Sequence, residues 1–177
     1  MKFAVIALAL GGALFASGPD NKVPRAKVAN VEKIINTQLA AMYPEEPYFL
    51  IGLTRGVYLE GFGVIFSADI NLATGPSLSP FKQTISQEEI ARHREKKEVR
   101  LPRLRNQMVS IVSSMSSYLE TLPPTEEFVM IVTLLKYPWE APAGQPVQIV
   151  MRAQKGKLQQ AEHDKIRPDA IIKLQEF

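Results

Sequence analysis

The most informative part of the sequence runs from Tyr48 to Leu72 and reads YFLIGLTRGVYLEGFGVIFSADINL. Its second half alternates between a mainly apolar set and a set that becomes polar towards its end. These sets are Phe62, Val64, Phe66, Ala68 and Ile70, and Gly63, Ile65, Ser67, Asp69 and Asn71. A period of two places the sets on opposite faces of a strand. We therefore predict two strands within Val57 to Ile70, joined by a turn at Glu60-Gly61, with the apolar face covered by the rest of the chain.

The first residues resemble a targeting segment rather than part of a folded domain. Lys2 is followed by the apolar run from Phe3 to Leu10 and then by small residues up to Gly18. A positive charge, a short apolar run and a small-residue end are typical of a secretory signal. The run is shorter than the about 20 apolar residues that span a bilayer, although an uncleaved anchor is the alternative. We expect residues 1–18 to be removed and residues 19–177 to form a single domain in the periplasm, at the cell surface or outside the cell.

Composition excludes several kinds of chemistry. The chain has no cysteine, which excludes a lipid-modified cysteine, disulfides, thiolate zinc sites and cysteine nucleophiles. The formal net charge of +3 is too small for a general nucleic-acid binder. We expect no cofactor, no metal and no nucleic-acid partner, and the partner stays open between an anionic envelope component and another protein.

Periodicity and turn residues predict the other elements. Apolar residues recur every three or four positions from Ala26 to Met42, as in an amphipathic helix. A long helical segment from Ser86 to about Leu122 has a charged first half and an amphipathic second half. Ser86 and Glu89 form a capping box at the start of the second helix, and Pro102 is expected to kink or break it into two segments. The remaining predictions are a strand at 127–137 near the centre of the sheet, a strand at 147–153, a short helix at 157–165 and a final strand at 169–177, where a helix is the alternative.

These elements predict an α+β fold. The expected order is α-β-β-α-β-β-α-β, with an antiparallel sheet of about five strands and helices mainly on one face. The antiparallel expectation rests on consecutive strands being joined by short loops.

The catalytic motifs are incomplete. His93 and His163 both have carboxylates nearby in the sequence, but we interpret both as residues of solvated helix faces. Ser79 and Lys82 match a Ser-x-x-Lys spacing of penicillin-interacting enzymes, but the other motifs of that set are missing and we treat the match as coincidence. We name no catalytic residue; a hydrolase site that folding assembles from His163 with Asp69 or Glu60 remains an alternative.

Two features favour binding. Tyr137 and Trp139 lie in a proline-rich loop and could hold a sugar or a peptide, although a tryptophan that covers the end of the sheet is the competing interpretation. The basic stretch from Arg92 to Arg105, including Arg94, Lys97 and Arg100, could contact anionic lipid, an anionic polymer or an acidic partner. A solvated helix with internal ion pairs is the competing interpretation there.

The sequence thus predicts an exported, non-catalytic α+β domain that binds a partner or has a structural role at the cell envelope. The alternatives are an exported hydrolase and a protein that associates with anionic surfaces through residues 92–105.

Overall fold

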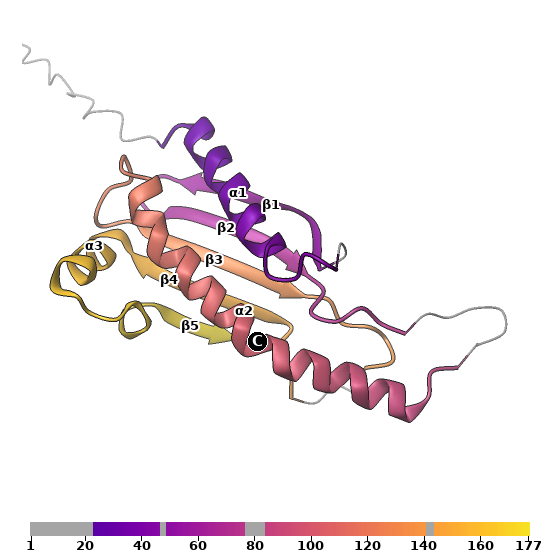
Figure 1. Ribbon diagram of the computed structural model, residues 1–177. Helices are drawn as coiled ribbons and strands as arrows, with labels where there is room; N and C mark the ends of the chain where they lie inside the picture. Colours follow the sequence, from indigo (N-terminus) through magenta and orange to yellow (C-terminus); the bar gives the residue numbers. More distant parts are fainter. Residues whose placement is uncertain (1–22, 47–48, 77–83, 141–143) are drawn as a thin grey trace, which may run out of the picture.

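The computed structural model describes residues 23–46, 49–76, 84–140 and 144–177 (Figure 1). The signal segment predicted at residues 1–18 lies outside these ranges. In order along the chain, the described residues form α1 (Arg25–Ala40), β1 (Leu50–Leu59), β2 (Gly63–Ile70), α2 (Gln87–Tyr118), β3 (Glu127–Leu134), β4 (Gln148–Gln154), α3 (Lys155–Asp164), the 3-10 helix η1 (Pro168–Ala170) and β5 (Lys173–Glu176). The predicted α+β class and the order of elements are confirmed, and the final segment is a strand.

The sheet is mixed rather than antiparallel throughout. Its five strands lie in the order β1-β2-β3-β4-β5, and β3 is central as predicted. Three of the neighbouring pairs are antiparallel, but β2 and β3 are parallel, with Gly63 opposite Glu127 and Ile70 opposite Leu134. The expectation of a purely antiparallel sheet was therefore wrong for this pair.

The helix between β2 and β3 explains the parallel pair. At 1.5 Å per residue, the 32 residues of α2 measure about 48 Å, enough to run back along the whole sheet. The chain leaves β2 at Ile70, returns through α2 and starts β3 beside the beginning of β2 (Figure 1). A helical crossover of this kind joins parallel strands.

The long helix α2 is uninterrupted, so the prediction of two separate segments was wrong. Its capping box is confirmed: the Glu89 amide donates to Ser86 Oγ at 3.2 Å, and the Ser86 amide donates to Glu89 Oε2 at 3.1 Å. Pro102 is exposed, whereas Leu101 and Leu104 on either side of it are buried. The Glu98 carbonyl that loses its donor at Pro102 can be hydrated, while the buried leucines hold both halves of the helix against the sheet.

The turn and the second strand of the hairpin are confirmed, whereas the first strand, β1, begins at Leu50, before the predicted start at Val57. The Phe62 amide donates to the Leu59 carbonyl at 3.0 Å, which closes a turn around Glu60 and Gly61, and Gly61 has a φ of 79°. Val64, Phe66, Ala68 and Ile70 are buried beneath the helices. Phe62 is the exception, with 43% of its surface exposed, because it belongs to the turn and not to the strand.

Helix α1 lies over β1 and covers its outer edge. Asn36 Oδ1 accepts from the Thr54 amide at 2.9 Å, and Glu32 Oε1 accepts from the Gly56 amide at 2.7 Å. These amides would otherwise be available to pair with another strand. None of the helices in the described ranges is both long and apolar enough to cross a membrane.

Candidate functional site

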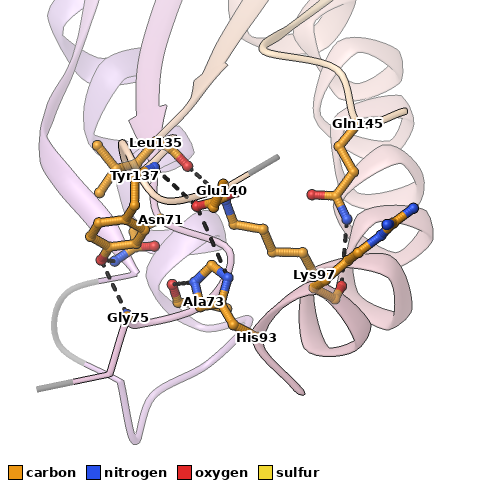
Figure 2. A network of polar contacts seen from close by, with 10 residues as sticks. Asn71, Ala73, Gly75, His93, Lys97, Leu135, Tyr137, Glu140 and Gln145 are labelled. Atoms are coloured by element: carbon orange, nitrogen blue, oxygen red, sulfur yellow. Dashed lines mark hydrogen bonds and ion pairs between the residues drawn. The ribbon is translucent and has the colours of Figure 1, made fainter. Parts of the chain in front are cut away.

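A buried ion pair joins α2 to the connection between β3 and β4. Lys97 Nζ lies 2.7 Å from each carboxylate oxygen of Glu140 and donates to the Leu135 carbonyl at 2.8 Å (Figure 2). The Lys97 side chain is 5% exposed and that of Glu140 is 12% exposed. Burial of two charges is tolerated when they are paired and hydrogen-bonded, as they are here. The pair therefore holds the first half of α2 against this end of the sheet.

His93 lies one helical turn before Lys97 and faces the same cluster. Its Nε2 is 2.9 Å from the Ala73 carbonyl oxygen, and its Nδ1 is 4.0 Å from Glu140 Oε1 (Figure 2). The contact with a carbonyl requires Nε2 to carry the hydrogen. Burial lowers the pKa of the His93 imidazole, although the Ala73 contact and the Glu140 charge act in the other direction. His93 is thus a neutral, buried residue, and its interpretation as part of a solvated helix face was wrong.

Tyr137 and Trp139 stack on each other beside this histidine. Their ring centroids are 5.1 Å apart with an interplanar angle of 10°, and the His93 ring meets both rings edge-on. The Tyr137 hydroxyl accepts from Asn71 Nδ2 at 3.0 Å and from the Gly75 amide at 3.2 Å. Both rings are half-buried, so Trp139 packs against Tyr137 and His93 and does not stand free in solvent.

A partly enclosed cavity of about 280 Å³ lies beside this cluster. The ion-paired Lys97 and Glu140, together with His93, form one polar part of its wall. Its apolar lining comes from α2 and from both sides of the sheet end: Leu72, Ile90, Ala91, Leu101, Leu134, Leu135 and Pro146. Gln87, Arg94, Lys136 and Gln145 complete the lining. The cavity is slightly smaller than the range of about 300–1,000 Å³ that is typical of small-molecule sites.

The structure brings most of the predicted binding residues to this region. Lys97 and Arg94 line the cavity, and Tyr137 and Trp139 pack against His93 in its wall. Arg94 also pairs with Glu98 at 2.9 Å.

Arg100 has a different environment and does not line the cavity. Its guanidinium donates to both Glu46 carboxylate oxygens, at 2.7 and 2.6 Å, and to the Leu72 carbonyl at 2.9 Å. It also lies over the Tyr43 ring, 4.2 Å from the centroid. The hydrogen bonds from Arg100, with a further one from Lys96, lower the pKa of Glu46 to about 2. Arg100 thus ties the turn after α1 to α2.

The Arg and Lys side chains of the basic stretch, residues 92–105, are all paired with other groups of the same protein. Each of its cations contacts a carboxylate or an aromatic ring: Arg92 with Glu88, Arg94 with Glu98, Lys96 and Arg100 with Glu46, Lys97 with Glu140, Arg103 with Tyr43, and Arg105 with Glu176. This arrangement favours the interpretation of residues 92–105 as a helix with internal ion pairs. It gives little support to association with anionic surfaces.

The alternative hydrolase site of His163 with Asp69 is not assembled. Asp69 lies opposite Thr133, which lies opposite Gln148, at one end of the sheet. Helix α3, which carries the exposed His163, begins after Gln154 at the other end (Figure 1). Glu60 lies in the turn between β1 and β2, at the end of the sheet where α3 begins, but among the described residues no hydrogen bond or ion pair joins it to His163. Ser79 and Lys82 lie outside the described residues. Within the described ranges, no group of three or more His, Asp or Glu side chains is placed to hold a metal ion.

A second, more open hollow of about 560 Å³ lies between α2 and α3. Its polar lining is dominated by serines of α2. Most of these hydroxyls donate to backbone carbonyls of the same helix: Ser113 to Val109, Ser114 to Ile111, Ser116 to Ser113 and Ser117 to Ser114. These serines are thus satisfied locally, and the hollow is a weaker candidate than the enclosed cavity.

Sequence reasoning missed Glu140 and His93 as members of the site. The spacing of four between His93 and Lys97 places both on one helix face, so that pair was open to prediction. Nothing in the sequence pairs Glu140 with Lys97, because the two residues are 43 positions apart.

Comparison of the chain with protein-family models, with curated proteins and with solved structures finds no match. The function must therefore be argued from the geometry of the described residues.

Proposed function

We propose that the chain is an exported, non-catalytic binding domain that holds a small, mainly apolar ligand in the cavity between α2 and the β3–β4 connection. The observation that carries the proposal is the cavity itself, about 280 Å³ in volume and lined by Leu72, Leu101, Leu134 and Leu135 among other residues. Leu72, Leu101 and Leu134 are buried core residues, so this lining is anchored in the fold. A concave, largely apolar site with a few fixed polar groups is the usual form of a small-molecule site.

The state of the polar groups supports binding rather than catalysis. His93 Nε2 donates to the Ala73 carbonyl at 2.9 Å. Lys97 directs its ammonium at Glu140 and Leu135. Among the described residues that line the cavity, none has a hydroxyl or thiol side chain that could act as a nucleophile. The polar wall is thus fixed in place, which lowers the entropic cost of binding.

Ligand binding can be measured by the fluorescence of Trp139. This residue is the only tryptophan of the chain, and its ring centroid lies 4.8 Å from that of His93, which lines the cavity. A panel of small apolar molecules titrated into the protein should contain members that change Trp139 fluorescence and raise the midpoint of thermal unfolding.

A cavity-filling variant and its control make this test specific. Ala91 lines the cavity on α2, so Ala91→Phe should abolish the fluorescence response. Ala26 is an exposed alanine in the first turn of α1, so Ala26→Phe should leave the response unchanged. A panel without any binder, or equal responses in both variants, would contradict the proposal.

Export is the other part of the proposal and rests on residues 1–18. Expression of the full chain in a bacterial host should yield a secreted or periplasmic protein whose mass corresponds to a start near Pro19. A chain that stays in the cytoplasm at full mass would contradict export without affecting the binding site.

A further inference from the structure

We infer that the ligand is an amphiphilic anion, with an apolar body of roughly nine non-hydrogen atoms and a single anionic group at the rim of the cavity. The inference rests on the proposed function, because it specifies the ligand class of the same site. It follows from the size of the cavity, its apolar lining and the sign of the charge around it.

Size and lining define the apolar body. A volume of about 280 Å³ corresponds to roughly nine groups of the size of a water molecule, at about 30 Å³ each. The side chains of Leu72, Leu101 and Leu134 cannot form hydrogen bonds with a ligand. A polar ligand body would therefore lose its hydrogen bonds to water and form no new ones with these residues. An alkyl chain or a small aromatic ring fits both the size of the cavity and its apolar lining.

The charge around the cavity defines the head group. Three cationic side chains line the cavity, Arg94, Lys97 and Lys136, and Glu140 is the single acidic one. Lys97 and Glu140 neutralise each other in their buried pair, and His93 is neutral because burial lowers its pKa. The remaining charge is therefore positive. It comes from Lys136 and from Arg94, whose partner Glu98 does not line the cavity.

These two cations are available to a ligand. Lys136 is exposed and forms no ion pair with any described residue, and it comes directly after Leu135 in the lining. Arg94 pairs with Glu98, but both side chains are more than half exposed, at 57% and 53%. An exposed pair of this kind contributes little free energy, so an incoming anion can compete for Arg94. A carboxylate, phosphate or sulfonate on the apolar body is attracted to the positive charge that these two lining residues contribute.

Octanoate and octan-1-ol are matched probes for this inference, because they share the alkyl chain and differ in the charge of the head group. Titrations followed by Trp139 fluorescence should show octanoate binding more tightly than octan-1-ol. Lys136→Glu should weaken octanoate binding about three- to ten-fold, since it replaces one exposed attraction by a repulsion, and should leave octan-1-ol binding unchanged. Lys33→Glu, an equal charge change on the exposed side of α1, should affect neither probe.

The outcomes separate this inference from the proposed function. Equal affinity for the two probes, unchanged by Lys136→Glu, would overturn the anionic head group while leaving an apolar binding site in place. Binding of neither probe, together with no response to any other apolar molecule, would overturn both. Octanoate binding that weakens equally in Lys136→Glu and Lys33→Glu would assign the effect to net charge and would also overturn the inference.

Discussion

Lys97 and Glu140, which are 43 positions apart in the sequence, form an ion pair in which Nζ is 2.7 Å from both carboxylate oxygens. The pair links the first half of α2 to the loop between β3 and β4. It also forms part of the wall of the proposed ligand site. Fold and site therefore depend on the same contact.

Removal of the lysine charge should cost much of the stability. In Lys97→Met, the Glu140 carboxylate stays 12% exposed and keeps the Tyr137 amide as a hydrogen-bond donor. A buried charge that loses its partner destabilises a protein by roughly 3–5 kcal/mol. Urea denaturation should show a loss of this size. The double variant Lys97→Met/Glu140→Gln should recover much of it, and a single variant as stable as the wild type would contradict the pairing.

Stability should fall as His93 becomes protonated. Burial lowers the pKa of His93 from 6.5 in the folded protein, so the unfolded chain binds the proton more readily. The free energy of unfolding should therefore decrease as pH falls below 6.5 and level off once the folded state is also protonated. The charged groups that face the ring are Glu140, Lys97 and Lys96.

The two histidines allow a matched comparison for that pH dependence. His93→Gln should remove this part of the decrease in stability, measured by thermal unfolding across the same pH range. His163→Gln, at an exposed position on α3, should retain it. A decrease that follows His163 instead of His93 would show that the buried ring does not titrate in this way.

Glu46 should stabilise the fold down to strongly acidic pH. Hydrogen bonds from Arg100 lower its pKa from 4.5 to about 2, so the folded state releases this proton more readily than the unfolded one. The resulting stability, roughly 3 kcal/mol at most, is fully present above pH 4.5 and is lost as pH falls towards about 2. Wild type and Glu46→Gln should therefore differ most above pH 4.5 and converge in acid. Glu45→Gln, at the exposed neighbouring position, is the control and should match the wild type.

Gly63 should tolerate no side chain. Its φ is 137°, and an added Cβ would overlap the Glu127 carbonyl oxygen and lie 2.7 Å from the Glu127 nitrogen, both in the neighbouring parallel strand. Gly63→Ala should cost more than about 3 kcal/mol in chemical denaturation, because backbone atoms of β3 must move. Gly61→Ala is the matched control, with a φ of 79° and open space around the added atom, and should cost only about 1–2 kcal/mol of backbone strain. Equal costs would argue against the close approach of β2 and β3.

Replacement of Pro102 should stabilise the protein. The residue lies inside α2 with its ring exposed, and proline in a helix interior is about 3 kcal/mol less favourable than alanine. Pro102→Ala should therefore raise the free energy of unfolding by about 1–3 kcal/mol, measured by urea denaturation. Unchanged or reduced stability would indicate that the helix depends on the proline.

The elements that sequence reasoning identified are those with a local cause. Ser86 caps α2 because its hydroxyl and the Glu89 carboxylate are three positions apart, and the β2 face is buried because its apolar residues alternate. The same local reasoning predicted a break in α2 at Pro102. This prediction was wrong because the buried residues Leu101 and Leu104 hold both halves of the helix against the core.

By itself, the sequence determined the α+β class and the order of elements. Only the tertiary structure decided that β3 runs parallel to β2 and that Lys97 meets Glu140. The physical reason is the distance along the sequence over which each interaction acts. Periodicity, caps and turns involve a few neighbouring residues. The direction of β3 and the partner of Lys97 depend instead on where a helix about 48 Å long returns the chain to the sheet.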